Sequence, residues 1–354
     1  MRIGKHNDNE TDWKVGDLTI KETNKYKYLG DIITNDGKNK ENLNARKTRL
    51  QSTTIIVNTI ASSDVLNKVE TAVLLELYEK KCVSSFLTNA EAWDLNKGDE
   101  TELEKMEINA IKLLFNLPVH IPSVAILYTF GIPYSSLRVH KMLLLYLHRL
   151  LTNDDDDWMK KALLTLQSLN IGWFKKIMSL IEQYELPSDF ESIRRHPPGE
   201  WKYKVLLGIE KKNKERLLQD CHKVVDGVEI RKTKTSTIVD KINIPNFNRK
   251  PIPEIMNLSK SETRTLMIAR YGMLQCGKNF GGTLNNSCDT CNCLDDENHR
   301  MNFCPKWGNN IDDADNEMIP FELVYSSDPL VLDKILPRIE QTWNTKNGHG
   351  TMNI

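Results

Sequence analysis

A short loop between Cys288 and Cys304 constrains this chain more than any other stretch. Its spacing, Cys-x2-Cys-x7-His-x4-Cys, brings together four candidate ligands, Cys288, Cys291, His299 and Cys304. Three thiolates and one imidazole are typical ligands of a closed, tetrahedral structural zinc site. Because the loop is rich in Asn and Asp and has almost no apolar core of its own, a bound metal would supply much of its folding free energy. The sequence therefore predicts a structural zinc here, with Cys293 as an alternative ligand; the competing interpretation is a reduced loop without metal.

The composition excludes several classes of protein. The chain has 354 residues, of which 40% are hydrophobic and 27% charged, and its net charge is zero. A chain without net positive charge does not attract nucleic acid as a whole, so any such surface would be local. The polar start lacks the apolar core of a signal peptide, and no run approaches the ~18 apolar residues of a membrane span. We expect an intracellular protein, in the nucleus or cytoplasm, that is not secreted and has no membrane partner.

The periodicity of apolar residues predicts a mainly α fold with a small β element at the start. Residues 13–20 and 26–34 have the pattern of strands and are followed by a strong turn signal. Three- and four-residue spacings then predict helices that include residues 41–58, 103–117 and 137–151, the last apolar on most sides and therefore central. We expect a helical bundle with a short N-terminal β-hairpin, a helical middle segment and a small zinc-knuckle loop.

The linear pattern predicts four segments. Residues 153–157 form a hydrophilic break with four adjacent aspartates, which repel one another and favour solvent. The expected segments are a hairpin with the first helix (1–60), a helical bundle (61–153), a helical connector with a basic linker (154–250), and a last helix with the Cys/His loop and an acidic tail (251–354).

Two groups of basic residues are candidates for contact with nucleic acid. One group lies on the first helix and the other on a later helix, where Trp201 and Tyr203 are interleaved with lysines. The candidate residues are Arg46, Lys47, Lys202, Lys204, Lys211 and Lys212. Cationic side chains neutralise phosphates, and aromatic rings offer stacking faces to bases. The alternative is a solvated helix face whose charges are balanced by nearby acids.

A series of short motifs adds a family resemblance. The motifs are Tyr26-Lys-Tyr28-Leu29-Gly30, Glu91-x-Trp93, Leu113-Leu-Phe-Asn-Leu117-Pro118, Gly131-Ile132-Pro133, Arg138-x-His140 and the Cys/His loop. In this order they resemble the thumb and C-terminal cysteine-rich region of reverse transcriptases from non-LTR (LINE-type) retrotransposons. The second motif departs from the family, because Thr88 and Asn89 stand where the family has Tyr and Gly.

The resemblance implies roles for these motifs. The turn Tyr28-Leu29-Gly30 would be the primer grip, a hairpin whose backbone approaches the end of a growing strand, and Gly30 would allow that approach. The alternative is an ordinary hairpin with Tyr28 and Leu29 buried. The implied partners are nucleic acid, as RNA template or DNA, and a polymerase palm or another protein encoded by the element.

The resemblance does not extend to a catalytic site. The family's catalytic aspartates belong to a segment upstream of these motifs. Acidic runs in this chain, at residues 154–157, 295–296 and 312–313, are expected in loops or an exposed tail. Two-metal phosphoryl transfer needs carboxylates that hold ions about 3.5–4 Å apart, which flexible loops do not provide. We expect no catalytic residue and no polymerase activity from this chain alone. The competing class is a helical interaction or scaffold protein with a structural zinc site.

Overall fold

The computed structural model describes residues 14–19, 23–62, 69–222, 224–225, 228–229, 251–272, 274, 287–305 and 318–344. The predicted mainly α fold is confirmed, and within these ranges the strands form short antiparallel pairs. The expected basic linker and the run at residues 312–313 lie outside the described residues. None of the described helices combines the length and apolarity required to cross a bilayer.

Contacts divide the chain into two compact units that are interleaved in sequence. Unit 1 comprises Met1–Thr54, Glu79–Ala110 and Pro133–Asn213, and unit 2 comprises Ile55–Tyr78, Ile111–Ile132 and Lys214–Ile354. This division differs from the four consecutive segments expected above. The hydrophilic break at residues 153–157 lies inside unit 1 because the helices on both sides of it pack together.

The N-terminal strands form two hairpins. Strands β1 (Lys14–Val15) and β2 (Leu18–Thr19) pair with each other, as do β3 (Lys25–Tyr28) and β4 (Asp31–Thr34). Each strand expected from the sequence is therefore a hairpin in itself. Glycine allows this reversal, because Gly16 has φ +59° and Gly30 has φ +96°. A third pair, β5 (Val224–Val225) with β6 (Val228–Glu229), lies in unit 2.

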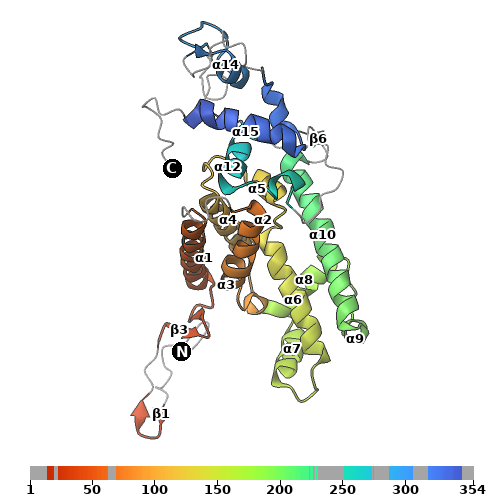
Figure 1. Cartoon of the computed structure of the whole chain (residues 1–354). Helices are drawn as coiled ribbons and strands as arrows, with labels where there is room; N and C mark the ends of the chain where they lie inside the picture. The colour runs from red at the N-terminus through yellow and green to blue at the C-terminus, as the bar shows by residue number, and fades with distance from the viewer. Residues whose placement is uncertain are drawn as a thin grey trace. The chain divides into compact units, whose positions relative to one another are not determined.

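The other regular elements of the described residues are helices (Figure 1). Those wholly in unit 1 are α3 (Ser84–Phe86), the 3-10 helix η2 (Ala90–Ala92), α6 (Ser135–Thr152), α7 (Trp158–Leu169), α8 (Gly172–Gln183) and α9 (Phe190–Arg195). Those wholly in unit 2 are α2 (Thr71–Leu77), α5 (Ser123–Phe130), η3 (Pro253–Ile255), α12 (Lys260–Arg270), α14 (Glu297–Asn302), η5 (Phe321–Tyr325) and α15 (Pro329–Asn344). Helices that begin in one unit and end in the other are α1 (Lys40–Ala61), the π-helix η1 (Tyr78–Val83), α4 (Lys97–Leu114) and α10 (Pro198–His222).

Helix α6 is the central helix of unit 1, as its apolar sequence predicted. All of its leucines except the half-buried Leu145 are buried, and it packs against η2, α7, α8 and α9. The indole Nε1 of Trp201, at the start of α10, donates a hydrogen bond of 2.9 Å to the carbonyl of Leu144. The ring of His148 lies 2.8 Å from the carbonyl of His196. The elements of unit 1 are thus arranged around α6.

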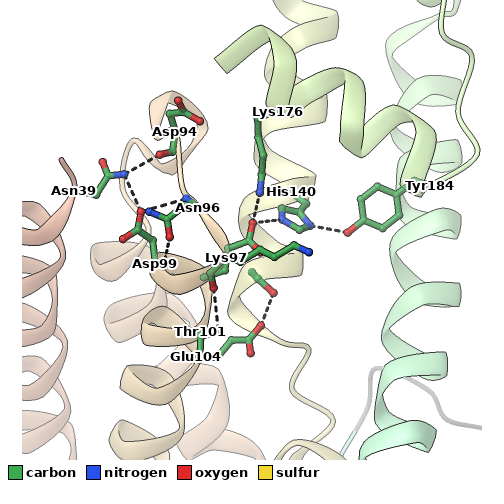
Figure 2. Close-up of polar contacts among 12 residues, drawn as sticks. Asn39, Asp94, Asn96, Lys97, Asp99, Thr101, Glu104, His140, Lys176 and Tyr184 are labelled. Carbon is green, nitrogen blue, oxygen red and sulfur yellow. Dashed lines mark hydrogen bonds and ion pairs between the residues drawn. The ribbon is translucent and has the colours of Figure 1, made fainter. Parts of the chain in front are cut away.

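A polar network joins α4, α6 and α8 inside unit 1. Figure 2 shows Lys176, His140 and Tyr184 along it. The carboxylate of Glu100 pairs with Lys176 and with Nε2 of His140 at 2.8 Å, while Nδ1 of His140 lies 2.7 Å from the Tyr184 hydroxyl. Burial alone would raise the pKa of Glu100, but the hydrogen bonds from His140 and Lys176 outweigh it and lower the pKa to about 2. Glu100 is therefore ionised at neutral pH.

In unit 2, helix α12 supports the Cys/His loop. A capping box formed by Ser259 and Glu262 begins the helix. The buried guanidinium of Arg270 pairs with Glu254 at 3.0 Å and donates to the carbonyl of Val324 at 2.9 Å. Helix α12 also packs on α15 and η5, and both of these elements contact α14, which carries the histidine of the loop.

Candidate metal centre and hairpin groove

The Cys/His loop is held by short local contacts. An isolated β-bridge joins Ser287 to Leu294, and the amide of Cys288 donates to the carbonyl of Cys293 at 2.8 Å. Asn292 takes a left-handed conformation with φ +55°, which allows the tight reversal. Helix α14 then begins with Asp296 as its N-cap. This turn and helix bring the cysteines and the histidine to one place.

The four predicted ligands form one cluster. One ligand atom from each of Cys288, Cys291, His299 and Cys304 can be chosen so that all four lie within 4.8 Å of one another. The sulfur of Cys304 is 3.6 Å from that of Cys288 and 3.9 Å from that of Cys291. Two sulfurs bound at about 2.3 Å to one tetrahedral ion lie about 3.8 Å apart. The cluster therefore has the donor set and the spacing to hold a metal ion.

Electrostatics around the cluster favour one ionised thiol. Burial opposes ionisation of Cys288, but a hydrogen bond from His299 and backbone amides of Thr290 and Cys291 outweigh it and lower its pKa to about 6. Desolvation raises the pKa of Cys291, and neighbouring Cys288 adds to the rise. Since a metal binds thiolates, Cys288 is ready at neutral pH, and the other two cysteines of the cluster must release their protons when the metal enters.

Cys293, the alternative ligand, lies beside the cluster rather than in it. Its side chain is exposed, and its sulfur is 3.2 Å from Nδ1 of His299. It is not a member of the four-residue cluster. The structure thus groups the four ligands that the spacing predicted and leaves Cys293 at their edge.

The turn between β3 and β4 is strained and exposed. Leu29 has φ +47°, a conformation that side-chain-bearing residues seldom adopt, and Gly30 follows with φ +96°. The exposed fraction is 58% for Tyr28 and 78% for Leu29. The alternative interpretation, an ordinary hairpin with both side chains buried, does not describe this turn. Instead, the hairpin presents an apolar tip to its surroundings.

Asp31, the residue that follows the turn, fixes the hairpin to the rest of unit 1. Its carboxylate pairs with Arg46 and accepts hydrogen bonds from Asn89 Nδ2 at 2.8 Å and Trp93 Nε1 at 3.3 Å. The Arg46 guanidinium also lies 5.2 Å from the centroid of the Trp93 ring and donates to the carbonyl of Ser85 at 3.2 Å. These contacts anchor a turn whose own geometry is unfavourable.

Arg46 therefore differs from the surface cation that the sequence led us to expect. Only 1% of its side chain is exposed. A buried guanidinium needs a paired carboxylate to offset its desolvation, and Asp31 supplies one. Arg46 is therefore not available to a nucleic-acid ligand. Its neighbour Lys47 is only half-buried, so part of its side chain is accessible.

A groove opens beside the turn. It has a volume of about 580 Å³ and is called the hairpin groove here. Its lining includes Tyr28, Leu29, Lys38, Glu91, Tyr146 and Arg149, all of unit 1. The Arg149 guanidinium lies 4.8 Å from the centroid of the Tyr146 ring, and this ring meets Trp173 edge-on. The sequence analysis missed Tyr146 and Arg149 because it treated helix α6 only as a buried core helix.

The lysines of α10 do not line the hairpin groove. Lys202 and Lys204 are exposed, Lys212 is half-buried, and Lys211 pairs with Glu185 at 3.0 Å. Trp201, expected as a stacking ring, is buried in the core, whereas Tyr203 is 66% exposed. This helix therefore presents lysines, but part of its charge is neutralised locally and one of its two aromatic rings is inaccessible.

The sequence and the structure were also compared with known proteins. No family model, no curated protein and no solved structure matches this chain.

Proposed function

We propose that this chain binds a nucleic-acid strand through the hairpin groove and that a zinc ion stabilises its Cys/His loop. The observation that carries the proposal is the turn at Leu29 and Gly30, both at positive φ, with its apolar tip exposed at the groove. A residue in a sparsely populated conformation costs on the order of 1–3 kcal/mol and persists where its surroundings impose it. The Asp31 contacts impose it here, so the turn is fixed before any ligand arrives.

The groove has the chemistry that an unpaired strand requires. Tyr28 and Tyr146 provide aromatic faces, and Lys38 and Arg149 provide cations. Base–aromatic stacking contributes about 1–3 kcal/mol per base and tolerates any sequence. Arg149 already lies over the Tyr146 ring, which orients its guanidinium for a phosphate next to a stacked base.

The order of the sequence motifs supports a relationship to the thumb and C-terminal region of LINE-type reverse transcriptases. In this proposal the strained turn is the grip that holds the end of a strand. The same relationship supports a partner with a polymerase palm. The proposal assigns strand binding to the hairpin and no chemical step to this chain.

Zinc is the metal that the ligand set favours. Three thiolates with one imidazole, mostly buried, are a ligand set typical of structural zinc sites. The loop would then be fixed by the metal at one end and by contacts of α14 at the other. The amide of Phe321, for example, donates to Asn298 Oδ1 at 2.7 Å.

The test is a binding titration with the full chain. Fluorescence anisotropy of labelled single-stranded and template–primer oligonucleotides should detect binding that weakens with salt. Removing the cation in Arg149→Ala should reduce the affinity about tenfold, corresponding to about 1.4 kcal/mol, and reduce the slope of log K against log salt by about one phosphate contact. Arg194→Ala is the matched control, because Arg194 is an exposed arginine of unit 1 outside the groove. Absence of binding at low ionic strength would refute the proposal.

A second candidate is a helical interaction or scaffold protein in which the metal only fixes the fold. Exposed isoleucines near the end of α1 favour it, since Ile55, Ile56 and Ile60 are 52%, 59% and 49% exposed. Exposed apolar groups that gather on one element are typical of protein-binding surfaces. The same titration separates the candidates, because a scaffold protein would bind neither oligonucleotide.

A further inference from the structure

Helix α7 of unit 1 carries a stripe of exposed residues that none of the described elements covers. Trp158, Ala162, Thr165 and Leu169 follow one another at steps of four, three and four residues, which places them along one side of the helix. The exposed fraction is 74% for Trp158 and 58% for Leu169, and the two residues between them are also exposed. The other side of α7 includes the buried Leu163, and the helix packs on α6 and α8. The stripe is therefore accessible to a partner.

The residues of the α7 stripe are suited to contact with another helix. Tryptophan is enriched at the centres of protein interfaces, where a few such residues carry much of the binding free energy. Ala162 and Thr165 lie between the two large side chains, and their small size allows another helix to approach closely. Anchors at steps of three and four residues are also the pattern by which one helix binds along another surface. The stripe thus has the form of a helix-binding surface.

The spacing of the stripe is the same when it is read from either end. If a second α7 is laid antiparallel on the first, Trp158 of each copy lies opposite Leu169 of the other. Ala162 of each copy then lies opposite Thr165 of the other, so that large side chains meet large ones and small meet small. A two-fold dimer requires a surface that complements itself in this way. A partner of a different sequence does not require this symmetry, so the stripe favours a second copy of the chain.

Charges at the two ends of the stripe favour the antiparallel arrangement. Residues 154–156, which precede the stripe, are three exposed aspartates, of which two pair with lysines of α7 itself. Asp154 has no ion pair among the described residues. At the other end the chain continues into α8, where Lys175 is exposed near the positive N-terminus of the helix. An antiparallel pair brings the acidic end of each copy to this positive end of the other, whereas a parallel pair would bring two acidic ends together.

We infer that two copies of this chain associate through α7 as an antiparallel, two-fold dimer. The inference does not depend on strand binding. A helix of this length extends only about 18 Å, so one helix from each copy buries less than the roughly 1,200 Å² of total surface that is usual for stable complexes. We therefore expect a weak dimer with a dissociation constant on the order of 10 µM.

The first test is analytical ultracentrifugation of the full chain without nucleic acid and in the presence of a reductant. The average mass of the unaltered protein should rise from that of a monomer towards that of a dimer between about 1 and 100 µM. Leu169→Glu places a charge in the stripe and should weaken association at least tenfold. Leu207→Glu is the matched control, because Leu207 is 56% exposed and lies on α10 of unit 1, and it should leave association unchanged.

The same experiment distinguishes a second copy from other occupants. A constant monomer mass over the whole range would overturn the inference. A monomer whose tryptophan emission shifts on addition of phosphatidylcholine vesicles, with no shift in Trp158→Lys, would assign the stripe to a lipid surface and would also overturn it.

A mixing experiment tests the antiparallel register. Trp158→Lys and Leu169→Glu should each remain monomeric at concentrations at which the unaltered chain dimerises. Mixed in equal amounts, the two variants should associate with each other more strongly than either does with itself. One contact then pairs the introduced lysine with the introduced glutamate, and the other keeps Trp158 opposite Leu169. Absence of association in the mixture, with circular dichroism showing both variants folded, would overturn the antiparallel arrangement.

Discussion

Replacing Arg46 distinguishes a structural role from a nucleic-acid contact. In Arg46→Ala the carboxylate of Asp31 loses its buried cation, Trp93 loses the guanidinium 5.2 Å from its ring, and the carbonyl of Ser85 loses a donor. Removing one partner of a buried ion pair costs about 3–5 kcal/mol, because an uncompensated charge remains. We therefore expect Arg46→Ala to reduce the free energy of unfolding of unit 1 by about 3–5 kcal/mol.

The assay is urea unfolding followed by tryptophan fluorescence. Among the described residues of unit 1, the tryptophans that report on it are Trp93, Trp158, Trp173 and Trp201. Lys47→Ala is the matched control, because the neighbouring Lys47 is a half-buried cation of the same helix. It should change the free energy of unfolding by less than about 0.5 kcal/mol, as is usual for substitutions outside the core. Equal stability of the two variants, with nucleic-acid affinity lost only in Arg46→Ala, would refute the structural role.

Three further predictions address the metal, the acid stability of unit 1 and the strained turn. Metal analysis of the purified chain should find about one zinc per molecule, and Cys291→Ser should lose it and increase amide hydrogen exchange in α14; metal-free protein with an unchanged loop would contradict this. Because the pKa of Glu100 is lowered from 4.5 to about 2 in the folded protein, its stabilising effect is present above pH 4.5 and is lost as the pH falls towards 2. Glu100→Gln should therefore lower the urea midpoint at neutral pH and converge with the unaltered protein near pH 2; an equal difference at both pH values would exclude this cause. Leu29→Gly should stabilise unit 1 by about 1 kcal/mol, because glycine relieves the positive φ, yet should weaken oligonucleotide binding through loss of the apolar tip; unchanged affinity would show that only the backbone of the turn is used.

The metal cluster could be predicted from the sequence because its determinants are local. All four ligands lie within one short loop, and the tight turn at Asn292 and the start of α14 bring them together. The mainly α fold was predictable for a similar reason, since helix periodicity is a property of neighbouring residues. The turn at Gly30 was predicted only through the family resemblance, because the residue pattern alone indicated one unbroken strand over residues 26–34.

Properties that depend on distant partners could not be predicted. Arg46 has the sequence context of a surface cation on an amphipathic helix, and only the fold places it beside Asp31 and Trp93. The interleaving of the two units likewise follows from which helices pack together, which the linear pattern does not contain. The hairpin groove arises in the same way, since Glu91 and Arg149 come from separate elements.

For the proposed strand binding, the lysines of α10 and the hairpin groove are alternative sites, and the observed contacts support the groove. Charge density alone singled out α10, yet Lys211 is neutralised by Glu185 and the Trp201 ring is buried against α6. Binding by the remaining exposed lysines would depend mainly on counterion release, with Tyr203 as the exposed ring of α10 that could stack on a base. The groove combines its cations with aromatic rings and a fixed turn, and the rings respond to bases rather than to phosphate. Loss of affinity in Arg149→Ala together with its retention in Lys202→Ala would therefore identify the groove as the site, because α10 contributes none of the side chains that line it.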